Sequence, residues 1–279
     1  MKPITRLIKP YLSAIEEGAR RLIVGRLDPQ AYAFYARLMA GGFAPNRYID
    51  VLPEQRIIYI CVPKSASSRI KMTLSALLGR FLTSEWEANN RKWSGLKSPK
   101  QVGLTVFRRI ATDPDALRFT FVRNPYARLV SCWISKFRNK PLIPVYPSVD
   151  SYLAWRQESD PSLPEGATHT LSFEAFVNFA TITARDRIDG HWHLQANLTD
   201  MPGIALDLVG KVESFKEDFM RVLDHVQAND ALRVDAVKPV NLSDDVYWPN
   251  YYTNELANRV YKAYELDFDR FQYARELPS

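Results

Sequence analysis

Short apolar runs, each followed by a polar loop and then by helical periodicity, recur along this chain. Residues 57–62 are apolar and β-branched and are closed by Pro63, which is typical of a strand buried on both faces. Residues 119–122 are predicted to form another short buried strand, and residues 206–212 a third strand. Strands that alternate with helices favour a parallel arrangement. The pattern therefore predicts an α/β fold with a mostly parallel central sheet flanked by helices.

Helices are predicted after these strands from capping residues and apolar spacing. Asn124 is a favourable N-cap and Pro125 a favourable first helical residue. Ser214 and Glu217 match a capping box. Ser172 is expected to cap a helix that runs through Thr183, and Thr253 to cap the last helix. The buried face of the helix that follows residue 62 is predicted to hold Ile70, Leu74, Leu77, Leu78 and Phe81.

The chain is predicted to consist of an N-terminal helical appendage, residues 1–50, and a single α/β domain, residues 51–279. The amphipathic appendage would suit packing or a homodimer contact. Residues 84–105 are polar and are expected to form an irregular surface segment. Residues 137–170 carry five prolines and several aromatic residues, which indicates a long irregular insertion that could cover a substrate.

Charge and cysteine usage narrow the class of protein. The net charge of +6 and the pI of about 9.2 favour anionic partners, but without a basic run they do not indicate nucleic acid. Cys61 and Cys132 lie in apolar contexts without a CxxC motif, so buried free thiols are expected rather than zinc or a disulfide. No signal-peptide core or transmembrane stretch is apparent, and we predict a cytoplasmic location.

The loop after the strand at 57–62 has the features of a phosphate cradle. Backbone N–H groups at a helix start bind anions, and Lys64 adds a full charge at the loop entrance. The loop is not a Walker A motif, because residues 56–78 contain no glycine and the lysine comes first. The alternative is an ordinary strand and helix with a polar connection. The candidate anion-binding residues are Lys64, Ser65, Ala66, Ser67, Ser68 and Arg69.

A second candidate anion site follows the strand at 119–122. Arg123 stands where this strand ends, and Ser131 lies about two turns into the next helix. Arginine presents a bidentate fork to oxyanions, so the pair could hold a second phosphate. The alternative is a structural ion pair and an ordinary helical serine. Both candidate sites fall at the carboxyl ends of strands, where ligands bind in open parallel sheets.

Taken together, these motifs resemble the carbohydrate sulfotransferase family, which includes Golgi chondroitin sulfotransferases and bacterial relatives. VPKSASSRIK is similar to the family's 5′-phosphosulfate loop, and FTFVRNPYARLVSCW to its 3′-phosphate segment. DGHWHLQANL resembles a His-Trp-containing segment of the family. VGKVESFKEDF and YYTNELANRVYKAYELDFDRFQY are similar to its closing elements. The resemblance covers roughly residues 56–80 and 118–273 and implies a three-layer fold similar to that of P-loop proteins.

The resemblance also implies a reaction and its co-substrate. The donor would be 3′-phosphoadenylyl sulfate (PAPS), the product adenosine 3′,5′-bisphosphate, and the acceptor a carbohydrate or other hydroxylated molecule. Residues 64–69 would hold the 5′ end, and Arg123 and Ser131 the 3′-phosphate. Lys64 would neutralise the departing phosphate, so that no metal is needed. His191 is favoured over His193 as the general base, the alternative being that both histidines are structural.

The family's membrane-anchored members carry an N-terminal span that this sequence lacks, so we expect a bacterial enzyme of the cytoplasm. Two other functions stay open. A phosphotransferase with a divergent P-loop would need a magnesium-binding aspartate after a strand, and none is obvious. A non-catalytic module for anionic polymers would bind with steep salt dependence.

Overall fold

The structure is a computed structural model that describes residues 28–40, 44–138, 152–153, 171–185, 189–238 and 247–278. The predictions for residues 1–27 and for most of the insertion at 137–170 lie outside these ranges. Predicted helical residues 31–38 do form a helix, α2 (Pro29–Ala40), which buries Phe34, Tyr35 and Leu38.

Four strands form one sheet in the order β1-β2-β3-β4. They are β1 (Ile49–Leu52), β2 (Ile57–Ile60), β3 (Leu117–Val122) and β4 (Leu208–Lys211). Every residue of β1 and β2 is buried, as expected for strands covered on both faces. The sheet is mostly parallel and flanked by helices, which confirms the predicted α/β class. The sequence pattern did not reveal β1, a four-residue strand that contains Asp50.

The chain separates into two compact units. Unit 1 contains residues 1–59, 96–119 and 201–207, and unit 2 contains residues 60–95, 120–200 and 208–279. The predicted division at residue 50, with one domain after it, stays a prediction.

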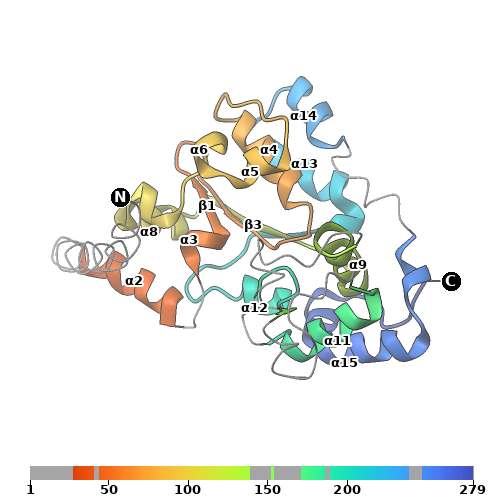
Figure 1. The fold of residues 1–279 in the computed structure, drawn as a ribbon. Helices are drawn as coiled ribbons and strands as arrows, with labels where there is room; N and C mark the ends of the chain where they lie inside the picture. The colour runs from red at the N-terminus through yellow and green to blue at the C-terminus, as the bar shows by residue number, and fades with distance from the viewer. Residues whose placement is uncertain are drawn as a thin grey trace, which may run out of the picture. The chain divides into compact units, whose positions relative to one another are not determined.

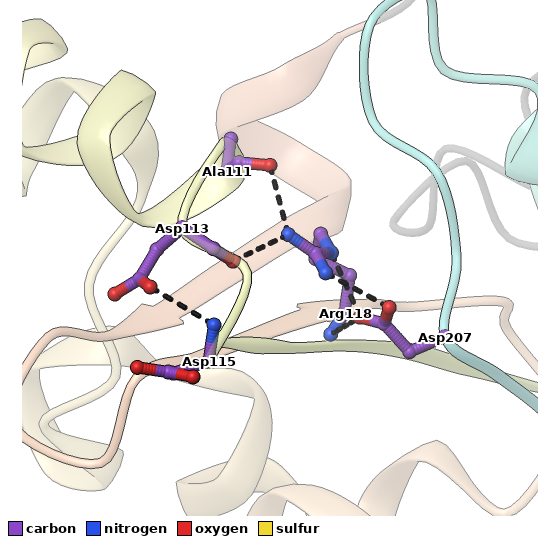
Figure 2. Close-up of polar contacts among 5 residues, drawn as sticks. All are labelled: Ala111, Asp113, Asp115, Arg118 and Asp207. Atoms are coloured by element: carbon purple, nitrogen blue, oxygen red, sulfur yellow. Dashed lines mark hydrogen bonds and ion pairs between the residues drawn. The ribbon is translucent and has the colours of Figure 1, made fainter.

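In unit 1, α2 packs on α8 (Leu104–Ala111), and the short helices α3 (Pro45–Tyr48) and α7 (Pro99–Val102) lie against β1. Arg118 on β3 is nearly buried and holds this unit together. Its guanidinium forms a two-pronged ion pair with Asp207 at 2.7 and 2.8 Å and donates to the carbonyls of Ala111 and Asp113 (Figure 2). Five donated hydrogen bonds, counting the one from its own N–H to Asp207, fix the start of β3.

In unit 2, three helices, α9 (Pro125–Lys136), α11 (Phe173–Thr183) and α15 (Asn254–Phe271), pack together around an aromatic core. Trp192 lies fully buried in that core. The loop after β2 leads into α4 (Ser67–Ala76), which contacts α5 (Glu85–Asn89), α6 (Arg91–Ser94) and α14 (Asp230–Ala236) (Figure 1). The remaining elements are α12 (Gln195–Thr199), η1 (Val212–Ser214), α13 (Phe215–His225) and η3 (Trp248–Tyr251).

The N-caps Asn124, Ser172 and Thr253 are confirmed, each accepting a backbone N–H of its helix. Three local predictions are wrong. Residues 84–105 hold α5, α6, α7 and the start of α8, because serine and asparagine N-caps open three of these short helices. Phe81 is 84% exposed, since α4 ends before it. Ser214 does not cap α13; its hydroxyl donates to Asp218 instead.

Candidate active site

The loop between β2 and α4 has an unusual backbone. Lys64 and Ala66 both adopt the left-handed conformation, with φ of 69° and 56°. Residues other than glycine pay about 1 kcal/mol or more for such a conformation, and the cost persists only where the surroundings impose it. Ala66 is the N-cap of α4 and has no side chain that could bind the helix's first N–H groups. The start of α4 is thus suited to an outside anion.

Lys64 is a half-buried residue, and burial lowers the pKa of its ammonium group below the ordinary value. The positive charges of Lys136 and Arg123 lower the pKa further, while the carboxylate of Glu85 opposes them. A lysine that is desolvated among other cations gains stability when an anion binds beside it. The negative charge of a phosphate or phosphosulfate group bound at this loop would compensate these positive charges.

The side chain of Gln195 joins this loop to the end of β3. Its Oε1 accepts hydrogen bonds from the Ser65 hydroxyl at 3.2 Å and from the Arg123 N–H at 2.9 Å. Its Nε2 donates to the Arg123 carbonyl at 2.8 Å. The two predicted anion-binding segments are thus neighbours, held at a fixed separation by one fully buried amide.

Gln195 is itself held by Asp267, a fully buried carboxylate on α15. Asp267 accepts from the backbone N–H groups of Gln195 and Ala196 at 2.9 and 2.8 Å, at the start of α12. Burial raises the pKa of Asp267, and these two hydrogen bonds act in the opposite direction. The bridge between the two segments consequently depends on a residue near the C-terminus.

Arg128 on α9 ties two further segments together. Its guanidinium is almost fully buried and donates to the carbonyl of Pro63 at 3.0 Å, of His193 at 2.8 Å and of Gly190 at 2.6 Å. Pro63 precedes Lys64, and the other two carbonyls flank the segment that carries His191. One side chain therefore positions both the lysine loop and the histidine segment.

His191 forms a dyad with Asp189. Its Nδ1 lies 2.5 Å from a carboxylate oxygen of Asp189, which also accepts the His191 N–H at 2.9 Å. With the Nδ1 proton directed to Asp189, the neutral ring presents Nε2 as a proton acceptor. Burial lowers the pKa of His191, Asp189 opposes this, and the charges of Lys136 and Lys64 lower it again. His191 thus lies within electrostatic reach of Lys64.

The other predicted site residues differ in their surroundings. Ser131 is buried on α9 and its hydroxyl has no hydrogen-bond partner within the described ranges. Arg69 contacts α14, donating to the Asp235 carbonyl at 3.2 Å and pairing with its carboxylate at 3.7 Å. His193 is buried, its N–H donates to the Asp189 carbonyl, and its own carbonyl accepts from Arg128. The backbone of His193 therefore has a structural role.

Comparisons with known proteins show the family of this chain. Residues 47–274 match the family described as "Sulfotransferase family". The chain belongs to the sulfotransferase family. It is 28% identical to carbohydrate sulfotransferase 11 of Mus musculus, over 82% of this chain and 68% of that protein. Its identity to carbohydrate sulfotransferase 14 of Homo sapiens is 25%, over 81% of this chain and 60% of that protein. No solved structure matches.

Membership of the sulfotransferase family confirms the resemblance inferred from the sequence motifs and makes the protein a sulfotransferase rather than a phosphotransferase or a polymer-binding module.

Within the described ranges, no group of three or more histidine, cysteine or acidic residues is arranged to hold a metal ion. The same part of the chain contains no helix that is both long and apolar enough to cross a membrane.

Sequence reasoning missed the residues that hold this sulfotransferase site in place. Gln195, Asp267 and Arg128 lie inside stretches that carry the family resemblance, but their roles could not be predicted, because their contacts lie 62 to 130 residues away along the chain. Asp189 could have been found from a local signal, because an Asp-x-His spacing lets the carboxylate reach both the ring and the N–H of the histidine. Cys61 and Cys132 are buried and free, as predicted, and burial raises the pKa of the Cys132 thiol to about 12.

Proposed function

We propose that this sulfotransferase binds PAPS across the two segments that Gln195 joins. The 5′-phosphosulfate would occupy the loop at Lys64, Ser65, Ala66, Ser67 and Ser68, with Arg69 at its α14 side, and the 3′-phosphate would lie between Arg123 and Ser131. The observation that carries this proposal is the Gln195 bridge, with hydrogen bonds of 3.2 Å to Ser65 and 2.9 Å to Arg123. A nucleotide with a phosphate on each of two ribose oxygens needs two anion sites at a constant distance.

The proposed reaction is an in-line transfer of the sulfuryl group. The bond from sulfur to the oxygen of the 5′-phosphate breaks while a bond from sulfur to the acceptor oxygen forms. The acceptor's hydroxyl proton moves to Nε2 of His191, whose Nδ1–H is directed to Asp189. Lys64 and the first N–H groups of α4 stabilise the charge that develops on the phosphate, which leaves as adenosine 3′,5′-bisphosphate. The scheme uses positioning and charge stabilisation and requires no metal.

A carbohydrate is the acceptor class we propose, because the curated relatives are carbohydrate sulfotransferases. A cytoplasmic location, a bacterial source and a homodimer stay predictions from the sequence. The relatives come from vertebrates, so a cytoplasmic location is best checked by fractionating cells that express the protein with its native N-terminus.

Sulfate transfer from labelled PAPS to a panel of polysaccharides tests the proposal. We expect Lys64→Ala to lower kcat/KM by about 30- to 1,000-fold, equivalent to roughly 2–4 kcal/mol of transition-state stabilisation. Lys216→Ala, an exposed lysine on α13, is the matched control and should leave the rate unchanged. Full turnover by Lys64→Ala would remove Lys64 from the mechanism.

A further inference from the structure

Helices α5 and α6 present two tryptophans to solvent. Trp86 is 64% exposed and Trp93 is 49% exposed. Their ring centroids are 6.1 Å apart, with the planes inclined at 56°. Large aromatic side chains that lie exposed side by side generally mark a binding surface, because leaving them in water forgoes their burial. This pair, Trp86 and Trp93, is named the tryptophan platform below.

The chain fixes the platform firmly although its helices have only five and four residues. A complete capping box between Ser84 and Glu87 starts α5, and the Asn90 side chain caps α6. Arg80 donates to the carbonyls of Lys92 and Trp93 at 3.0 and 3.1 Å. Such capping predisposes the two rings to one arrangement, which lowers the entropic cost of binding a ligand.

Gly95, at the end of α6, completes this support. Its φ is 73°, and a Cβ placed there would lie 2.5 Å from Nε of Arg80. Only glycine therefore lets the arginine pack under the end of α6 and hold Trp93.

The platform is attached to the helix that begins at the candidate phosphosulfate loop. α5 and α6 pack on α4, and Nζ of Lys71 on α4 donates to the Asn89 side chain on α5 at 3.0 Å (Figure 1). Glu85, which immediately precedes Trp86, lies close enough to Lys64 for its charge to raise the lysine's pKa. The platform is therefore packed on the helix whose first N–H groups are proposed to hold the phosphosulfate.

The surroundings of the platform favour an anionic ligand. The side chains of Arg80 and Lys92 are exposed next to Trp93 in the fold. Of the two acidic residues on α5, Glu87 is engaged by Thr83 and Ser84 in the helix cap. That leaves the exposed carboxylate of Glu85, whose charge opposes the lowering of the Lys64 pKa.

We propose that the tryptophan platform binds the acceptor, an acidic polysaccharide whose sugar rings stack on Trp86 and Trp93. Sugar rings carry apolar C–H faces that pack on aromatic rings, and the carboxylates of uronic acids would pair with Arg80 and Lys92. This inference rests on the proposed function and adds to it the surface that receives the acceptor. An extended chain on the platform would deliver one hydroxyl to His191 while further sugars remain bound.

Calorimetric binding of unsulfated chondroitin to the full chain tests this surface independently of activity. Its alternating uronic acid and amino sugar supply both features that the platform requires. We expect Trp86→Ala and Trp93→Ala each to weaken binding roughly three- to tenfold. Trp86→Tyr should retain most of the affinity, since a flat ring remains. Ile182→Ala, an equally exposed apolar side chain on α11, is the matched control and should bind as the wild type does.

Kinetics with PAPS and the same polysaccharide separate this inference from the proposed function. The platform variants should raise KM for chondroitin while the affinity for adenosine 3′,5′-bisphosphate stays constant. Wild-type chondroitin affinity in the double variant Trp86→Ala/Trp93→Ala would overturn the platform even if sulfation proceeds. Conversion of an oligomer to a monomer by the same substitutions would also overturn it, because a second copy would then cover the rings. Failure of the wild type to bind adenosine 3′,5′-bisphosphate would instead contradict the proposed function.

Discussion

Two buried arginines, Arg118 in unit 1 and Arg128 in unit 2, hold their surroundings in different ways. The guanidinium of Arg118 pairs with the carboxylate of Asp207 through two hydrogen bonds of 2.7 and 2.8 Å. Arg128 donates to the carbonyls of Pro63, Gly190 and His193. Arg118 also donates to two backbone carbonyls, but its charge is matched by one acid, whereas these three bonds from Arg128 all go to backbone carbonyls, in two loops.

The difference matters for function. An arginine matched to a carboxylate can be replaced together with its partner, because both charges disappear at once. The bonds from Arg128 to backbone carbonyls are different, because substituting a second side chain cannot remove those carbonyls. Arg128 also lies between the Lys64 loop and the His191 segment, so its loss should disturb catalysis as well as folding. Arg118 should matter for stability alone.

The largest effect is expected from Arg128→Met. Two buried carbonyls and one partly buried carbonyl would lose their donor, at about 1 kcal/mol or more for each buried group, so the free energy of unfolding should fall by about 3 kcal/mol. Sulfation should be abolished in the protein that remains folded. Chemical denaturation and labelled-PAPS assays at low temperature provide the measurements. An active Arg128→Met enzyme of normal stability would show that the two loops hold their positions without this side chain.

Arg118→Leu should lower the free energy of unfolding by about 2 kcal/mol. This loss is smaller than the one expected when a fully buried ion pair is broken, since Asp207 is partly exposed. Adding Asp207→Leu should restore much of that loss, because no unpaired charge remains. Neither variant is expected to change kcat. Denaturation midpoints of the two single variants and the double variant form the test cycle. Absence of rescue would place the importance of Arg118 in its bonds to Ala111 and Asp113.

Gln195→Met keeps the volume of the side chain and removes its three hydrogen bonds. We expect about 1–2 kcal/mol of destabilisation and a roughly tenfold weaker binding of adenosine 3′,5′-bisphosphate, because the Ser65 and Arg123 segments would no longer be held together. Thr199→Val, which removes a hydroxyl bonded only within α12, is the matched control. Unchanged nucleotide affinity in Gln195→Met would show that the Gln195 hydrogen bonds do not contribute to nucleotide binding.

The smallest effect concerns pH. His191 must be neutral to accept a proton, so kcat/KM should rise with pH through its pKa and then level off. Because burial lowers that pKa, the midpoint of the acidic limb should lie below the ordinary value of 6.5. Asp189→Asn removes the charge that raises the pKa, and should move the limb further towards acid. A limb above pH 6.5, or one that Asp189→Asn leaves in place, would exclude His191 as the titrating base.

Local signals in the sequence predicted those parts of the fold that depend on neighbouring residues. Asn124 and Pro125 determine where α9 begins, and the apolar runs determine β2 and β3. The short helices α5 and α6 were missed because polar residues without apolar periodicity are typical of loops, and only their caps distinguish them. Lys64 and Arg123 could be proposed from charge at strand ends.

The bridge through Gln195 could not be predicted, because it depends on which distant segments the fold brings together. Gln195 bonds to Ser65, which is 130 residues earlier, and to Asp267, which is 72 residues later. A single sequence carries no spacing rule for contacts of that kind.

The central claim is that one nucleotide spans the Lys64 loop and Arg123. Calorimetric binding of adenosine 3′,5′-bisphosphate and of 5′-AMP, to the wild type and to Arg123→Ala, tests it directly. The account predicts that the wild type binds the bisphosphate at least about tenfold more tightly than 5′-AMP, and that Arg123→Ala binds both alike, since a charge-assisted bond contributes roughly 1.5–3 kcal/mol. An equal preference for the bisphosphate in both proteins would contradict it, because the 3′-phosphate would then be recognised elsewhere.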